Sequence, residues 1–133
     1  MTPRRERIRV LLCNNHNLFR EGIKALFPET AVIEIVGEAT TARQALILLV
    51  RLRPDVVLLD ATTSDLGGSE ATRRIKAVSP HVEILILSLS DDEPLISACL
   101  DAGAAGCIRR GDNPLHLERA ISMAYDRRTQ HAA

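Results

Sequence analysis

Aromatic side chains are nearly absent from this chain of 133 residues, which contains one tyrosine, two phenylalanines and no tryptophan. Its core must therefore be aliphatic, and it lacks the aromatic platforms on which proteins stack single-stranded nucleic acids. An excess of positive charge is also missing, because 17 Lys and Arg residues balance 17 Asp and Glu residues. A self-sufficient DNA-binding domain is usually basic, so the composition argues against direct DNA binding.

Long apolar runs and closely spaced cysteine pairs are missing as well. No apolar run approaches the roughly 18 residues of a membrane span, and no signal-peptide pattern is present. Cys13, Cys99 and Cys107 are odd in number and widely separated, which favours reduced and mostly buried thiols. The sequence therefore predicts a cytoplasmic protein that does not contact a membrane.

The most informative stretch is the aliphatic run Val56–Leu59, which is followed by Asp60. The run is too short for a typical helix, and Pro54 and the pair Gly67-Gly68 mark its flanks. This pattern predicts a strand that is buried on both faces, as in a parallel sheet. Asp60 would then lie at the carboxyl edge of the sheet, where open α/β proteins place their ligands and chemistry.

The rest of the chain alternates between short aliphatic runs and segments with helical periodicity. Strands are expected at residues 8–13, 32–38, 55–60, 83–88 and 106–109, with helices after each of them. Parallel strands need crossover connections, and every crossover here is helical, so we expect a doubly wound (βα)5 sandwich of the α/β class. Its length suits one domain, at residues 8–126, with a flexible N-terminal tail at 1–7 and a C-terminal tail at 127–133.

Local patterns also predict helix ends and inner faces. The candidate caps precede three of the periodic segments: Asn15 or Asn17, Thr40 or Thr41, and Asp91 or Asp92. Two inner faces are expected, one in the third helix and one in the last: Ala71, Ile75 and Val78, then Leu117, Ile121 and Ala124.

Polar groups follow four of the predicted strands. They are Asn14-Asn15, Asp60, Ser88 with Leu89 beside it, and Arg109-Arg110. Each residue alone is explained by a loop, a cap or a solvated surface. Because the carboxyl ends of parallel strands meet at one edge, we expect the four groups to converge there.

Five segments carry a family resemblance: NLFREGI at 17–23, VGEA at 36–39, RPDVVLLD at 53–60, EATRRI at 70–75 and AGAAG at 102–106. From about Ile8 to Tyr125 the chain resembles the receiver domain of a bacterial two-component response regulator. It is most similar to the NarL/FixJ type, which usually carries a C-terminal LuxR-type helix-turn-helix.

The resemblance implies a flavodoxin-like fold with strand order 2-1-3-4-5. It also implies phosphoryl transfer from a histidine kinase to Asp60, with Ser88 and Arg110 as the switch and phosphate-contact positions.

The chain departs from the family around Asp60. Asn14 and Asn15 replace the acidic pair that holds Mg²⁺, whose position would be formed by Asn15, Asp60 and the backbone of Thr62. Mg²⁺ usually needs one or two carboxylate ligands. We therefore expect no metal and no cofactor, with Mg²⁺ retained only if the domain works conventionally.

Four further departures surround the same position. Leu89 replaces a small residue and would block access, Thr63-Ser64-Asp65 replaces Met-Pro-Gly, and Cys107 replaces an aromatic residue. Arg110 replaces the family's lysine, and a guanidinium can bind a carboxylate through two hydrogen bonds. Our hypothesis is that Arg110 pairs directly with Asp60 in place of the metal ion.

The leading interpretation is an atypical receiver, a regulatory interaction module rather than an enzyme, which works in transcription control largely without Mg²⁺-dependent phosphorylation. The expected partners are a second copy of the chain and a histidine kinase or another regulatory protein. DNA would be contacted only through a LuxR-type helix-turn-helix, which this chain lacks.

Two alternatives remain open. A conventional receiver phosphorylated on Asp60 would also retain Asp60, Ser88 and a cation at position 110. A nucleotide- or flavin-binding protein of the same fold is the remote alternative. It would need a glycine-rich phosphate loop after the first strand, and residues 14–17 contain no glycine.

Overall fold

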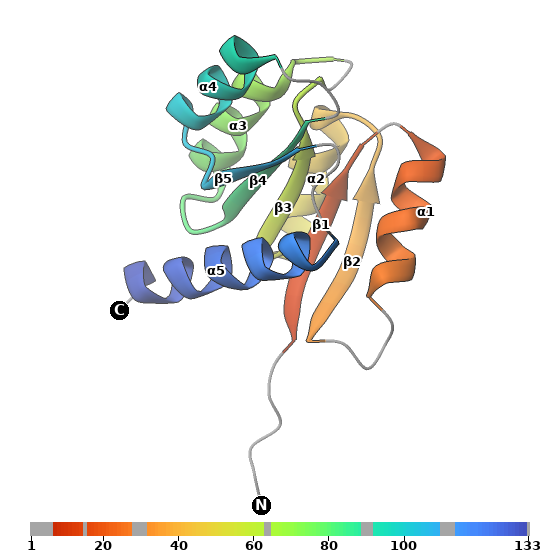
Figure 1. Cartoon of the computed structure of the whole chain (residues 1–133). Helices are drawn as coiled ribbons and strands as arrows, with labels where there is room; N and C mark the ends of the chain where they lie inside the picture. The colour runs from red at the N-terminus through yellow and green to blue at the C-terminus, as the bar shows by residue number, and fades with distance from the viewer. Residues whose placement is uncertain are drawn as a thin grey trace, which may run out of the picture.

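The computed structural model describes residues 7–14, 16–27, 32–62, 65–88, 92–109 and 114–132, in which strands and helices alternate (Figure 1). The strands are β1 (Ile8–Cys13), β2 (Ile33–Ala39), β3 (Val56–Asp60), β4 (Glu83–Ser88) and β5 (Gly106–Arg109). The helices are α1 (Asn17–Leu26), α2 (Ala42–Leu52), α3 (Gly68–Val78), α4 (Glu93–Asp101) and α5 (Pro114–Ala132).

The five strands form one sheet in the order β2-β1-β3-β4-β5, and every neighbouring pair is parallel. This arrangement confirms the predicted (βα)5 sandwich and its strand order. All residues of β3 and β4 are buried, which explains why these two strands are uninterrupted aliphatic runs. The edge strand β2 is only partly buried over most of its length, in keeping with its more polar sequence.

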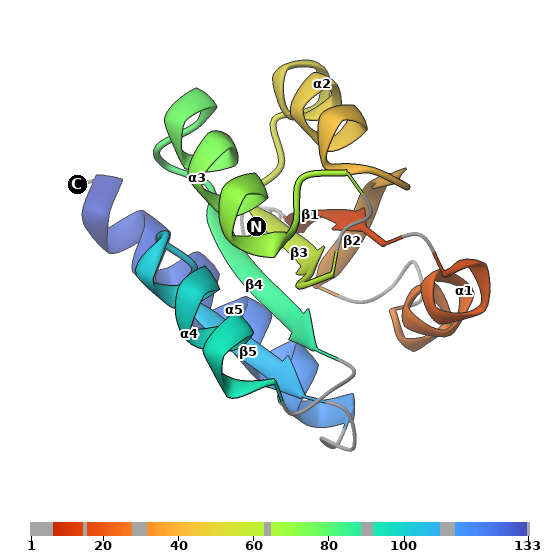
Figure 2. The same ribbon diagram turned by 90° about the horizontal axis from the view of Figure 1, so that it is seen from above.

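Each face of the sheet packs against its own set of helices. One core joins Leu11, Leu59 and Ile86 to residues of α2, α3 and α4. The other joins Leu12 and Leu58 to residues of α1 and α5. Figure 2 shows α2 and α3 on one side of the sheet and α1 on the other. Both cores are aliphatic, as the scarcity of aromatic residues requires.

Helix capping follows the sequence at α2 and α4 but not at α1. The hydroxyl of Thr41 accepts a hydrogen bond from the backbone N–H of Gln44, and Asp92 accepts one from the N–H of Leu95. The cap predicted at Asn17 is wrong, because Asn17 is already helical and His16 holds the capping position without a side-chain cap. The other predicted caps at this end and at α4, Asn15 and Asp91, lie outside the described residues.

The structure corrects two further predictions, one about the inner face of α3 and one about the C-terminal residues. Val78 is not on the inner face of α3: its side chain is 52% exposed. At 3.6 residues per turn it lies roughly 70° from the centre of the buried stripe, which runs through Gly68, Ala71, Thr72 and Ile75. Residues 127–132, which the sequence assigned to a C-terminal tail, are helical, since α5 continues to Ala132.

The buried aliphatic residues should dominate the stability of the fold. Replacing Ile86, which is fully buried between β3 and β5, with alanine should lower the free energy of unfolding by about 2–5 kcal/mol. The matched control is Ile47→Ala on the outer surface of α2, where the side chain is 61% exposed and the change should stay within about 0.5 kcal/mol. Urea denaturation measures both, and equal losses would contradict this assignment of the core.

Candidate functional site

Asp60 carries a buried carboxylate at the carboxyl end of β3, and the residue is only 3% exposed. Its Oδ1 accepts two hydrogen bonds from Thr62, one from the backbone N–H and one from the hydroxyl, both of 2.8 Å. Its Oδ2 accepts a third, of 3.2 Å, from the side-chain Nδ2 of Asn14. A buried charge is tolerated only when such partners replace the water it has lost. Neighbouring residues therefore solvate this carboxylate.

Asn14 presents its amide nitrogen, and not its oxygen, to Asp60. The amide Oδ1 accepts a hydrogen bond of 2.5 Å from the backbone N–H of His16. This contact spans two residues, the pattern by which asparagine commonly stabilises a turn. With its oxygen held there, Nδ2 is the group that faces Asp60. The turn after β1 thus fixes which end of the amide reaches the site.

The described neighbours of Asp60 do not supply the carboxylate that the Mg²⁺ site implied by the family resemblance has at position 14. A hard cation needs oxygen ligands around Asp60, and a carboxylate at position 14 would supply one. Asn14 instead directs N–H groups at Asp60. Among the described residues, no group of three or more His, Cys, Asp or Glu side chains could hold a metal ion.

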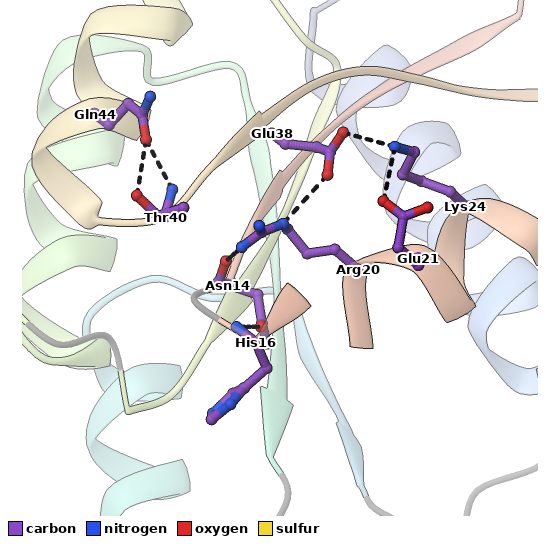
Figure 3. A network of polar contacts seen from close by, with 8 residues as sticks. All are labelled: Asn14, His16, Arg20, Glu21, Lys24, Glu38, Thr40 and Gln44. Carbon is purple, nitrogen blue, oxygen red and sulfur yellow. Dashed lines mark hydrogen bonds and ion pairs between the residues drawn. The ribbon is translucent and has the colours of Figure 1, made fainter. Parts of the chain in front are cut away.

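Arg20 of α1 holds the other side of Asn14 (Figure 3). Its guanidinium donates to the backbone carbonyl of Asn14 and, over 3.2 Å, to the carboxylate of Glu38 on β2. The Arg20 side chain is 12% exposed, so this ion pair is partly shielded from solvent. It therefore connects α1, β2 and the end of β1 at the corner beside Asp60.

Lys24 extends the same network towards the surface. Its ammonium group lies 3.0 Å from Glu38 and 3.3 Å from Glu21. Hydrogen bonds with Glu38 and then Glu21 raise the pKa of Lys24 above its usual value. Ion pairs as exposed as those of Lys24 contribute little to stability. We therefore assign to Arg20, and not to Lys24, the role of holding α1 against β2 and the end of β1.

Asp65 lies in the connection between β3 and α3. Its two carboxylate oxygens accept hydrogen bonds of 2.9 and 3.0 Å from the backbone N–H groups of Ala42 and Arg43, at the start of α2. Burial opposes ionisation of Asp65, but the backbone hydrogen bonds from Ala42, Arg43 and its own segment outweigh it and lower its pKa. Asp65 therefore carries its negative charge to the positive end of the α2 dipole.

Ser88 and Arg109 mark the ends of the next two strands. Ser88 is 3% exposed and follows Leu87, which pairs in register with Asp60. Arg109 is directed to α4, where its guanidinium contacts the carboxylate of Glu93. Asn15, Leu89 and Arg110 lie outside the described residues. The predicted pairing of Arg110 with Asp60 thus stays a prediction, as does the blocking role of Leu89.

Sequence reasoning missed two of the residues that organise this site. Arg20 lies within a segment that carries the family resemblance, but no pattern linked it to Asn14. Asp65 was noted only as a departure from the family. Its partners are more than 20 residues away in the chain, so the contact has no signal in local spacing.

Comparison with protein families identifies the chain. The model of the response regulator receiver domain matches residues 10–122, which is most of the sequence. The chain belongs to the response regulator receiver family. Receiver domains of this family are signalling modules rather than enzymes. Within the described residues, no helix is long and apolar enough to cross a membrane.

Curated relatives support this assignment. Response regulator UvrY of Escherichia coli is 36% identical over 118 residues, which cover 89% of this chain and 54% of that protein. Response regulator GacA of Pseudomonas viridiflava is 31% identical over 118 residues, or 89% of this chain and 55% of that protein. The chain therefore spans about half the length of these curated relatives.

Solved structures share the fold. A LuxR-family two-component response regulator from Aurantimonas sp. matches with a TM-score of 0.84 and 30% identity, covering 91% of this chain and 86% of that one. The receiver domain of the putative response regulator NarL from Mycobacterium tuberculosis also has a TM-score of 0.84, at 26% identity, covering 91% of this chain and 98% of that one.

The cysteine next to this site should resist thiol reagents. Burial raises the pKa of the Cys13 thiol to about 12, and the nearby charges of Asp65 and Asp60 act in the same direction. Brief alkylation with iodoacetamide at about pH 8 should therefore label the half-buried Cys107 and spare Cys13. Peptide mass analysis gives the labelled fraction at each cysteine. The urea-denatured protein is the control, and equal labelling of both cysteines in the native protein would contradict the burial of Cys13.

Proposed function

We propose that this receiver domain acts as a regulatory interaction module that is largely independent of Mg²⁺-dependent phosphorylation of Asp60. The hydrogen bond from the Asn14 amide to the buried Asp60 carboxylate carries this proposal. The receiver family places an acidic pair at this point to hold Mg²⁺. Here the neighbour of Asp60 is a neutral donor.

Electrostatics supports the loss of metal binding. Asn14 and Asn15 remove two negative charges from the position that would attract the cation. Two unit charges about 4 Å apart interact by on the order of 1–4 kcal/mol, according to how well the site is screened from water, and the double charge of Mg²⁺ doubles this for each carboxylate. Losing two such contributions weakens Mg²⁺ binding by several orders of magnitude at the upper end of this range.

The contacts of Asp60 also support a single conformation without phosphate. Thr62 and Asn14 together donate three hydrogen bonds to the carboxylate. A phosphoryl group on Asp60 would have to displace some of these donors. The predicted roles of Leu89 in limiting access and of Arg110 in pairing with Asp60 act in the same direction.

Family membership supports a biological setting for this domain. UvrY and GacA are response regulators by name, and the Aurantimonas relative belongs to the LuxR family. We accordingly place this domain in cytoplasmic signal transduction and transcription control. Its proposed partners are a second copy of the chain and a histidine kinase or another regulatory protein. Contact with DNA would run through a LuxR-type helix-turn-helix outside residues 1–133.

A conventional receiver is the second candidate, and one observation favours it. Asp60 and Ser88 are both buried, and they lie at the ends of adjacent strands. The phosphoacceptor and switch positions are therefore retained even though the metal-binding carboxylates are not.

Intact-mass analysis after incubation with acetyl phosphate and excess Mg²⁺ separates the two candidates. We expect no phosphoryl adduct on the wild-type protein, because the cation that would assist transfer binds too weakly. The Asp60→Asn variant is the control for modification elsewhere. A single adduct on the wild type that disappears in this variant would contradict the proposal and support a conventional receiver.

A further inference from the structure

Thr62 and Asp65 both follow β3, and their side chains bind different parts of the protein. Thr62 turns back to Asp60 and donates two hydrogen bonds to it. Asp65 is directed to α2, where it accepts hydrogen bonds from Ala42 and Arg43. The guanidinium of Arg43 also lies 3.8 Å from the Asp65 carboxylate. One short segment is therefore bonded both to the buried carboxylate and to a neighbouring helix.

Asp65 completes the capping of α2. The first N–H groups of a helix have no partners within it. The Thr41 hydroxyl accepts from Gln44 over 3.1 Å, and Asp65 accepts from the two preceding N–H groups. An aspartate also matches the positive end of the helix dipole. Its side chain is 14% exposed, so the interaction is partly shielded from water.

The far end of the same segment is held by close packing. The N–H of Gly68 donates to the carbonyl of Ala61 over 3.0 Å. A Cβ at position 68 would lie 2.6 Å from that carbonyl oxygen and 2.8 Å from the Cys99 sulfur. Only glycine fits this approach of α3 to the end of β3.

Thr62 is covalently tethered to Asp65 across two residues. Consecutive Cα atoms are about 3.8 Å apart, so a fixed Asp65 confines Thr62 to within about 11 Å. The hydrogen bond from Gly68 to Ala61 restricts the position of Thr62 further. Fixing Asp65 on α2 therefore reduces the conformations through which Thr62 could leave Asp60.

We propose that Asp65 is a positioning residue: by binding the first turn of α2, it keeps Thr62 on Asp60 without a metal ion or a phosphoryl group. The inference rests on the proposed function, because it takes Asp60 and its hydrogen-bond partners as the regulated site. The inference adds how the contacts of Asp60 are held in one arrangement, and it couples them to the N-terminus of α2.

Hydrogen exchange measured by NMR on the whole chain tests this role. In Asp65→Ala, the backbone amides of Ala42 and Arg43 lose their acceptors and should exchange about fivefold faster or more. The amide of Thr62 should also exchange faster, although its own acceptor is untouched. Asp65→Asn should give an intermediate effect, because the amide retains one oxygen acceptor.

The matched control is Asp92→Ala, which removes an aspartate cap from α4. Exchange should rise at Leu95 and stay unchanged at Thr62. If Asp65→Ala unfolds, the comparison is made with Asp65→Asn. Faster exchange at Ala42 and Arg43 with no change at Thr62 would overturn the proposal and leave Asp65 as a simple helix cap.

These readouts do not depend on phosphorylation. A phosphoryl adduct on wild-type Asp60 would contradict the proposed function and leave the exchange pattern unaffected. An unchanged Thr62 amide in both Asp65 variants would overturn the positioning role alone.

Discussion

The hydrogen bond between the Asn14 amide and the buried Asp60 carboxylate is the contact on which the rest of this site depends. It places a neutral donor where the family has a second anion. Two carboxylates at this distance would repel each other unless a cation lay between them. With asparagine the pair is attractive by itself, without a cation between the two side chains.

That contact is held from two directions. Arg20 binds the carbonyl of Asn14 and the carboxylate of Glu38, and so secures the turn after β1 against α1 and β2 (Figure 3). Asp65 binds the start of α2 and so restrains the segment after β3. Each of the two residues binds backbone groups of a neighbouring element, and neither touches Asp60 in the contacts described.

Much of the fold was predictable because it depends on local periodicity and on the pairing rules of parallel sheets. The bounds of β1, β4 and β5 follow directly from where their apolar runs end. Sheet topology also predicted that Asn14 and Asp60 approach each other. It could not predict which end of the Asn14 amide faces Asp60, because His16 decides this through its backbone N–H. Asp65 was unpredictable for a related reason, since its partners on α2 are remote in sequence and bind it mainly through backbone N–H groups.

A Mg²⁺ titration followed by the amide signals of Asp60 and Thr62 tests the central claim most directly. The wild-type protein is compared with a variant in which both Asn14 and Asn15 are replaced by aspartate, and the same spectra report whether each is folded. Our account predicts that the variant binds Mg²⁺ at least about tenfold more tightly, because two carboxylates are restored. Saturation of the wild type at the same Mg²⁺ concentration as the variant would contradict it.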